Sequence, residues 1–404
     1  MLKIIIMILL ILIVIYVTHF IVINIGNLKK SKEKKIKEKK NFFAILIAAR
    51  NEELVIENLI KSLKRQNYPK DKYEIYVITN NCTDNTATVS KKAGATVIEC
   101  KEKVKSKGEV LKYIFSKLKD NKEIDVYAIF DADNLVDNKF LKEMNDTINE
   151  GYNVSQGFRD TKNIGDNWLT SSYALLYYID NLFINKARYK MKKSAFLNGT
   201  GFVVKKEIID KYGYDPKTLT EDVEFTALCA LNDEKIAFTE TAVIYDEQVQ
   251  DLKTSMNQRK RWSFGALQCF RFYYKDLIKK AFKDKSYCAL DILLYTMSIV
   301  FQVLAALLSI LLLVDILINI NNINITNTLI FSLISLAVVY ICGILIRVYL
   351  IKLYNKNIKD NIGGILLFDL FLLTWIPINF ICLFINKCNW DSIKHNRNVE
   401  IDKV

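Results

Sequence analysis

Carboxylates are the side chains best placed to do acid–base chemistry in the central part of this sequence. The chain has two histidines, His19 and His395, and both lie outside that part. Two acidic motifs lie within it, Asp131-Ala132-Asp133 after an apolar run and Thr220-Glu221-Asp222 before one. Carboxylate oxygens bind hard divalent cations, and a carboxylate can take a proton from an attacking hydroxyl. We therefore expect a metal held by Asp133 and a general base at Asp222.

A repeated strand–helix pattern positions these acids. Apolar runs typical of strands occur at residues 43–48, 74–79, 95–99 and 125–130. Helical periodicity occurs between them, at 52–66 and 110–118. This alternation predicts a doubly wound α/β sheet, and ligands of such sheets bind at the carboxyl ends of the strands. Segments 49–51, 80–84 and 131–133 fall at that edge, so we expect them to converge.

The second half of the central part is less regular. We expect a helix at 167–190, an interrupted apolar run at 196–204 and a strand at 237–245. Thr220 is expected to cap a helix that runs to Leu231, because threonine accepts hydrogen bonds from the first turn.

Apolar residues at the N-terminus predict a membrane anchor. Residues 4–28 contain no Asp, Glu, Lys or Arg, and about 20 apolar residues suffice to cross a bilayer. A lysine-rich run follows, where a cleaved signal peptide would have small residues, so an uncleaved anchor is favoured. Positive charge stays on the cytoplasmic side, which predicts a cytosolic central domain. The same lysines explain much of the net charge of +13. We expect this positive charge to bind anionic lipid head groups rather than nucleic acid.

The C-terminal third predicts further membrane helices, at 292–314, 328–346 and 363–385. Three complete spans would place the C-terminus outside, whereas its cations favour the cytoplasm. Either one stretch is interfacial or re-entrant, or the region between Tyr287 and Ile320 holds two pieces. Asp369 within the last stretch is a functional candidate with no evident partner.

These features divide the chain into six predicted segments. They are a transmembrane anchor (1–28), a basic linker (29–41), a cytosolic catalytic domain (42–262), an interfacial helix (263–285), C-terminal transmembrane helices (286–388) and a cytosolic tail (389–404). The eight cysteines form no CxxC pair, so free thiols are expected rather than disulfides or zinc ligands.

Five motifs occur in an order that resembles the family 2 inverting glycosyltransferases of the GT-A type. They are Ala49-Arg50-Asn51-Glu52-Glu53, Asn80-Asn81-Cys82-Thr83-Asp84, Asp131-Ala132-Asp133, Thr220-Glu221-Asp222 and Gln258-Arg259-Lys260-Arg261-Trp262. The resemblance covers about residues 43–262 and is greatest to membrane synthases of cellulose, hyaluronan and poly-N-acetylglucosamine. It implies a GT-A-like doubly wound mixed sheet flanked by N-terminal and C-terminal transmembrane helices.

The resemblance also implies a donor site. A UDP-sugar donor is implied, with N-acetylglucosamine or glucose as the sugar and Mg²⁺ or Mn²⁺ as the cofactor. The implied nucleotide-binding residues are Ala49, Asn51, Glu52, Asn80, Asp84 and Lys107. Relatives usually carry Asp where Asn80 stands, and Asn binds the base without a charge. Asp131 would face the sugar or ribose.

The acceptor side is implied by the remaining motifs. Gly199, in Asn198-Gly199-Thr200-Gly201, resembles an acceptor loop whose glycines permit close backbone approach. Gln258, Arg261 and Trp262 fit a QxxRW pattern, in which the arginine forks onto a diphosphate and the tryptophan stacks on an acceptor sugar. Residues 390–395 faintly resemble a gating loop, although a polar tail is favoured.

Each motif also has a purely structural interpretation. The acids can form strand-end turns and helix caps, and Asn80–Asp84 can form an Asx turn. Lys107 can be a solvated residue at the start of a helix. The last motif can be a basic segment beside the membrane. The favoured function is transfer of a sugar to a growing glycan or a lipid. A non-catalytic nucleotide-binding transporter or scaffold is the alternative.

Overall fold

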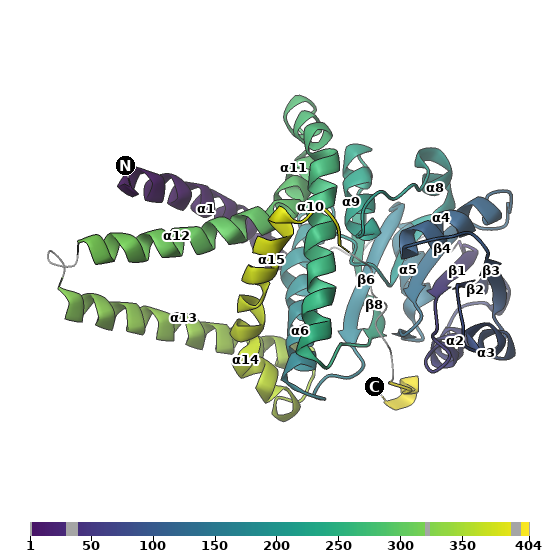
Figure 1. The fold of residues 1–404 in the computed structure, drawn as a ribbon. Helices are drawn as coiled ribbons and strands as arrows, with labels where there is room; N and C mark the ends of the chain where they lie inside the picture. Colours follow the sequence, from purple (N-terminus) through teal and green to yellow (C-terminus); the bar gives the residue numbers. More distant parts are fainter. Residues whose placement is uncertain (1, 30–38, 320–323, 389–396, 404) are drawn as a thin grey trace.

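The fold is built on a mixed sheet of eight strands, ordered β3-β2-β1-β4-β7-β6-β8-β5. The computed structural model describes residues 2–29, 39–319, 324–388 and 397–403. The strands are β1 Phe43–Ala49, β2 Tyr73–Asn80, β3 Thr96–Cys100, β4 Val126–Asp131, β5 Leu135–Val136, β6 Val154–Thr161, β7 Phe202–Lys205 and β8 Ile236–Asp246. Figure 1 shows the sheet at one end of the molecule and long helices projecting from the other.

The sheet is parallel in its first half, because helices connect successive strands there. β1 pairs in parallel with β2 and β4, and β2 with β3. β7 then runs antiparallel to both β4 and β6. The predicted doubly wound mixed sheet is therefore confirmed, and the antiparallel β7 is what makes it mixed.

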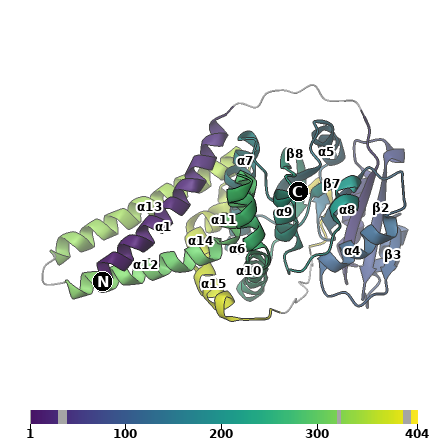
Figure 2. The same ribbon diagram turned by 90° about the horizontal axis from the view of Figure 1, so that it is seen from above.

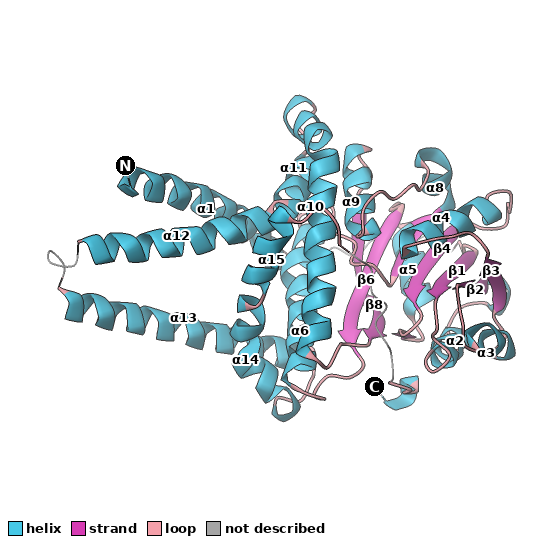
Figure 3. Cartoon of the chain, viewed as in Figure 1, coloured by secondary structure: helices cyan, strands magenta, loops and turns pink. Residues whose placement is uncertain are grey.

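Helices cover both faces of the sheet (Figure 3). The helices of the catalytic region are α2 Ile56–Lys64, α3 Thr86–Lys92, α4 Lys107–Leu118, α5 Phe140–Asn149, α6 Trp168–Ile179, α7 Ala187–Lys190, α8 Lys206–Tyr212 and α9 Glu221–Leu231. α2 and α5 bury apolar side chains against one face, and α4, α6 and α8 against the other. The helix expected at 167–190 is α6 and α7 joined by a π-helix, Asp180–Lys186.

β6 is a central strand that the sequence pattern did not indicate. All eight of its residues are buried, although Ser155, Gln156, Arg159 and Asp160 are polar. Hydrogen bonds compensate their burial: the Gln156 amide, for example, donates to the Thr200 carbonyl at 2.9 Å. Alternating apolar residues were therefore not required to bury this strand.

The longest helix, α10 Leu252–Lys283, corrects the predicted boundary at residues 262 and 263. Asp251 caps it, since its side chain accepts a hydrogen bond from the Thr254 amide at 2.8 Å. The helix thus begins before the QxxRW motif rather than after it. One continuous helix therefore carries Gln258, Arg261 and Trp262. It includes the end of the predicted catalytic domain (42–262) and the predicted interfacial helix (263–285).

Three apolar helices project together from the catalytic domain, as Figures 1 and 2 show. They are α1 Leu2–Asn24, α12 Ser298–Ile318 and α13 Ile325–Leu353. α14 Ile362–Leu373 and α15 Trp375–Phe384 instead lie across their bases, packed along α6 and α10. Within the described residues, four helical stretches, 2–28, 298–318, 326–353 and 359–384, are long and apolar enough to cross a membrane.

The region between Tyr287 and Ile320 contains the short apolar helix α11 Tyr287–Thr296 before α12, and of these two helices only α12 is long enough to span a membrane. α11 also fastens α1 to the domain. Asp291 on α11 accepts a hydrogen bond from His19 Nε2 at 2.9 Å and pairs with the Arg188 guanidinium at 2.7 and 2.9 Å. All three side chains are largely buried, so this contact holds the first helix in one place.

The C-terminal residues return to the catalytic domain. Arg65, directly after α2, pairs with Asp402 at 2.7 Å, and Arg397 pairs with Asp166 at 2.9 Å. Residues 30–38 of the basic linker and the gating-loop resemblance at 390–395 lie outside the described residues.

Candidate active site

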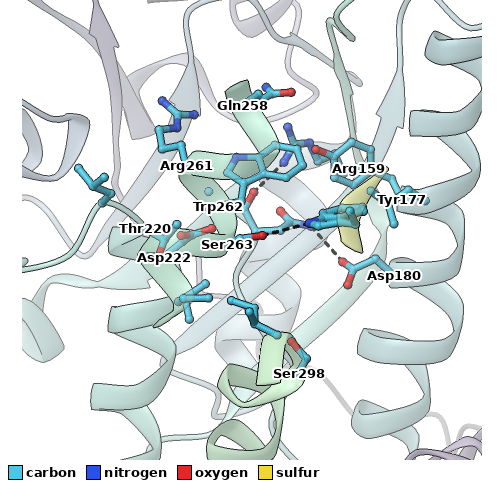
Figure 4. Close-up of a pocket in the computed structure, with 18 of the residues that line it drawn as sticks. Arg159, Tyr177, Asp180, Thr220, Asp222, Gln258, Arg261, Trp262, Ser263 and Ser298 are labelled. Carbon is cyan, nitrogen blue, oxygen red and sulfur yellow. Dashed lines mark hydrogen bonds between the residues drawn. The ribbon is translucent and has the colours of Figure 1, made fainter. Parts of the chain in front are cut away.

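One cavity of about 1160 Å³ lies between the carboxyl edge of the sheet and the helices. Its lining includes eleven of the predicted site residues: Ala49, Glu52, Asn80, Lys107, Asp131, Asp133, Gly199, Asp222, Gln258, Arg261 and Trp262. The expected convergence of the strand ends is thus found. Figure 4 shows Asp222, Gln258, Arg261 and Trp262 gathered around this cavity.

Asn51 and Asp84 do not line the cavity. Asn51 has a positive φ of 59°, and its side chain accepts a hydrogen bond from the Thr83 amide at 2.8 Å. Asp84 accepts bonds from the Thr86 hydroxyl at 2.6 Å and the Glu53 amide at 3.1 Å. Although partial burial opposes its ionisation, these bonds hold the pKa of Asp84 below its ordinary value. The hydrogen bonds of both residues therefore connect the loop after β1 to the loop after β2.

Asn80 at the end of β2 is available to a ligand. It is buried, and its Nδ2 has no hydrogen-bond partner among the described residues. An unmet amide donor of this kind is costly unless a ligand accepts from it.

Lys107 joins two of the predicted motifs. At the first residue of α4, its Nζ donates to Asp131 Oδ1 at 2.5 Å and to the Gly199 carbonyl at 2.8 Å. Burial alone would lower the pKa of Lys107, but Asp131 and then Glu221 raise it above its ordinary value. The ammonium is therefore charged and directed into the cavity. Its interpretation as a solvated helix start is wrong.

Glu221 and Asp222 begin α9 and face the cavity together. Burial raises the pKa of Asp222, and burial with the neighbouring Asp222 charge raises that of Glu221 to about 7. Gly199, at φ +91°, lets the backbone approach, since an added Cβ would lie 3.4 Å from Asp222 Oδ2. Thr220 makes no side-chain capping bond, which contradicts its predicted role, because it packs against Gly265 of α10.

The QxxRW motif presents one helical face to the cavity. Gln258, Arg261 and Trp262 are spaced i, i+3 and i+4, so they share that face. The Trp262 ring meets Tyr173 edge-on, with centroids 6.2 Å apart. Arg259 points the other way and donates to the Phe371 carbonyl at 3.0 Å and to Thr374 Oγ1 at 2.8 Å. That arginine fixes the junction of α14 and α15.

Comparison with known proteins identifies the chain. A family model described as "Glycosyltransferase like family 2" matches residues 40–265. The chain belongs to this glycosyltransferase family. Within it, the narrower resemblance to synthases of cellulose, hyaluronan and poly-N-acetylglucosamine stays a prediction.

Two curated relatives are similar to the glycosyltransferase. A probable glycosyltransferase, YdaM, of Bacillus subtilis is 27% identical over 246 residues, covering 55% of this chain and 54% of the relative. A beta-monoglucosyldiacylglycerol synthase of Nostoc is 26% identical over 256 residues, covering 61% and 53%. The chain thus spans about half the length of these relatives.

A solved structure with the same fold is a mannosyltransferase from Pyrobaculum calidifontis, crystallised with GDP-mannose and Mn²⁺. It superposes with a TM-score of 0.61 at 17% identity and covers 89% of this chain and 99% of its own. This likeness confirms the GT-A architecture and extends it into the C-terminal helices.

Oxygen donors of this glycosyltransferase fit a divalent cation. Asp133 is 4% exposed, and its Oδ2 accepts a hydrogen bond from the Glu247 amide at 3.3 Å. Asp131 and Glu247 line the same cavity, and Lys162 pairs with the Glu247 carboxylate at 2.9 Å. Within the described ranges, no three His, Cys, Asp or Glu side chains are grouped to hold a metal by themselves. Such a set suits Mg²⁺ or Mn²⁺, which are held by one or two carboxylates and the phosphates of a substrate.

Several lining residues of the glycosyltransferase were missed by the sequence analysis. Arg159 of β6 donates to Asp246 Oδ2 at 3.1 Å and to the Asn198 carbonyl at 2.8 Å, and lies 4.1 Å from the Tyr177 ring centroid. Burial raises the pKa of Asp180 to about 6. Figure 4 shows Arg159, Tyr177 and Asp180 on the side of the cavity opposite Asp222. They follow no motif, so the sequence offered no signal for them.

Proposed function

We propose that the chain is an inverting glycosyltransferase that moves a sugar from a UDP-sugar to an acceptor in the membrane. One observation carries this proposal: Asp133, Asp222 and Trp262 share a single cavity that continues among apolar helices. A transporter or scaffold would have no need for a base, a cation site and a stacking tryptophan in one place.

The donor would bind at the strand ends. Asn80 can donate its unmet Nδ2 hydrogens to the base, and Arg261 offers a fork for the diphosphate. Lys107 holds Asp131 in position next to the sugar. Asp133, with Asp131 or Glu247, would hold Mg²⁺ or Mn²⁺, which neutralises charge that develops on the leaving diphosphate.

Asp222 is proposed as the general base. Its raised pKa suits proton uptake, because a more basic carboxylate accepts a proton more readily near neutral pH. It would take the proton from an acceptor hydroxyl that attacks the anomeric carbon opposite the diphosphate. Attack from that face inverts the configuration, so the product is β-linked from an α-linked donor.

The sugar and the location are also proposals. Glucose and N-acetylglucosamine are the favoured sugars, and the relatives named beta-monoglucosyldiacylglycerol synthase support glucose and a lipid acceptor. A growing polysaccharide remains the second acceptor. We propose three spans, α1, α12 and α13, with the catalytic domain and C-terminus in the cytoplasm. The crosswise position of α14 and α15 and the lysine-rich linker support this topology.

A UDP-release assay on purified membranes tests the function. Because a general base contributes about 10²–10⁴-fold, Asp222→Asn should lower release from UDP-glucose or UDP-N-acetylglucosamine by at least about 100-fold. Asp276→Asn, an exposed carboxylate elsewhere on α10, is the matched control and should retain wild-type release. Equal release from the wild type and Asp222→Asn would exclude Asp222 as the base.

A further inference from the structure

The cavity extends well beyond the donor site. We call the lining residues from α1 and α12–α15 its membrane half, and the remainder its donor half. Pockets for a single small ligand typically measure roughly 300–1,000 Å³, and the 1160 Å³ here exceed that range. The membrane half therefore offers room for a second substrate beside the donor.

The membrane half opens sideways. Leu336 and Val339 of α13 line it, yet they are 67% and 69% exposed. Ala305 and Ala306 of α12 form the opposite wall with small side chains. Figure 1 shows α12 and α13 separated where they meet the domain, with α15 between them. In a bilayer, this opening would face acyl chains.

Charge is distributed very unevenly between the halves. The cations that line the cavity all belong to the donor half: Arg50, Lys105, Lys107, Arg159 and Arg261. The membrane half has Asp369 as its single charged lining residue among those described, and Arg347 pairs with it at 2.8 Å. Asp180 and Asp222 lie where the halves meet. A lipid phosphate in the membrane half would thus meet no cation in the described lining, because Arg347 is paired with Asp369 outside it, and would approach two acids.

Neutral hydrogen-bonding groups line the junction instead. The Trp375 indole donates to Ser263 Oγ at 3.1 Å, and Ser263 donates to Asn379 Oδ1 at 2.6 Å. Asn379 Nδ2 donates in turn to Gln302 Oε1 at 2.6 Å. Ser263 directly follows Trp262, so this chain lies beside the acceptor-stacking residue (Figure 4). Hydroxyl and ester groups match such partners, whereas phosphates favour Arg and Lys.

We propose that the membrane half admits one neutral lipid alcohol between α12 and α13 and presents its free hydroxyl to Asp222. This inference rests on the proposed function and specifies its acceptor. The lipid oxygen bonds to the anomeric carbon while the bond from that carbon to the diphosphate oxygen breaks. The hydroxyl proton passes to Asp222, and UDP leaves. A phosphate acceptor is already ionised and would need no such base.

An acceptor panel tests the chemistry of the lipid. The full chain in phosphatidylcholine nanodiscs is given radiolabelled UDP-glucose or UDP-N-acetylglucosamine with diacylglycerol, a polyprenyl phosphate or a glucose oligosaccharide. Label should enter diacylglycerol at least tenfold faster than either rival. Preferential labelling of the polyprenyl phosphate or the oligosaccharide would overturn the inference while leaving the transferase function intact. No UDP release with any acceptor would instead count against the proposed function itself.

Substitutions in the wall of the membrane half test where the lipid binds. Ala306→Phe fills the α12 wall and should raise the KM for diacylglycerol about tenfold while leaving the KM for the UDP-sugar unchanged. Ala337→Phe on α13 is the matched control, because Ala337 is exposed and lies outside the lining. Equal KM values for diacylglycerol in the two variants would refute lateral entry between these helices. A fluorescence-detected elution profile shows that both variants fold.

Discussion

The donor half and the membrane half of the cavity are held in shape by different forces. In the donor half, ion pairs and hydrogen bonds orient the charged groups, such as Lys107 with Asp131 and Arg159 with Asp246. In the membrane half, apolar side chains and a chain of neutral hydrogen bonds form most of the walls, and Asp369, paired with Arg347, is the charged exception among the described residues. Charge positioned in advance stabilises a transition state, whereas apolar walls select a ligand by size and polarity. Substitutions in the donor half should therefore change turnover, and those in the membrane half the use of the acceptor.

After Asp222→Asn, the substitution Asp133→Asn should have the largest effect on the donor half. Losing a charge aimed at the reacting groups costs about 10²–10³-fold in kcat, and added Mg²⁺ or Mn²⁺ should not restore it. The measurement is UDP release against metal concentration. If the variant keeps wild-type kcat without a change in metal dependence, the cation site lies elsewhere.

Gly265→Ala should disturb the donor half from a distance. The added Cβ would lie 2.5 Å from the Thr220 side chain, so the start of α9 must shift. A displacement of about 1 Å at the chemistry can cost on the order of 10²-fold, and we expect a tenfold or greater loss of kcat. Wild-type kcat in Gly265→Ala would show that this contact does not position Asp222.

Activity should depend on pH through Asp222. The base must be ionised, and burial raises the pKa of Asp222, so kcat/KM should fall about tenfold per unit as pH drops below that raised pKa. The positive charge of Lys107 lowers the pKa of Asp222, so Lys107→Gln should raise this pKa further and move the acid limb to higher pH. A pH–rate profile of both proteins measures the shift. An unchanged limb, or a shift to lower pH, would contradict the assignment.

Gln302→Leu should have the smallest effect, confined to the membrane half. It removes one neutral hydrogen bond to Asn379, worth roughly 1 kcal/mol, so the KM for the lipid acceptor should rise about fivefold. The KM for the UDP-sugar should stay constant. If the donor KM rises equally, the two halves do not act separately.

The sequence revealed the donor half better than the membrane half. Asp131, Asp133 and Asp222 follow strand ends or begin a helix, and the strand–helix rhythm alone brings such positions to one edge. The same rhythm could not show that Asn51 and Asp84 turn away from the cavity, because that depends on bonds between two loops.

Long-range contacts account for what was missed. β6 has a polar sequence, and its burial is explained only by distant partners such as Thr200, in the loop before β7, and Asp246 at the end of β8. Arg347 lies in a different helix from Asp369, so hydropathy could not identify the pair. Nor could it show that α14 and α15 lie across the bases of the projecting helices and along α6 and α10, since apolar composition alone does not fix the direction of a helix.

The fastening of α1 by His19, Asp291 and Arg188 has a practical consequence. Tyr16 and Phe20 on that helix contribute to the wall of the cavity. Deleting the residues before position 40 to obtain a water-soluble enzyme would remove this wall. It would also remove His19 and leave Asp291 and Arg188 buried without this partner. If the acceptor is the proposed lipid, the smallest active unit must therefore include α1, whose last turns carry Tyr16, His19 and Phe20.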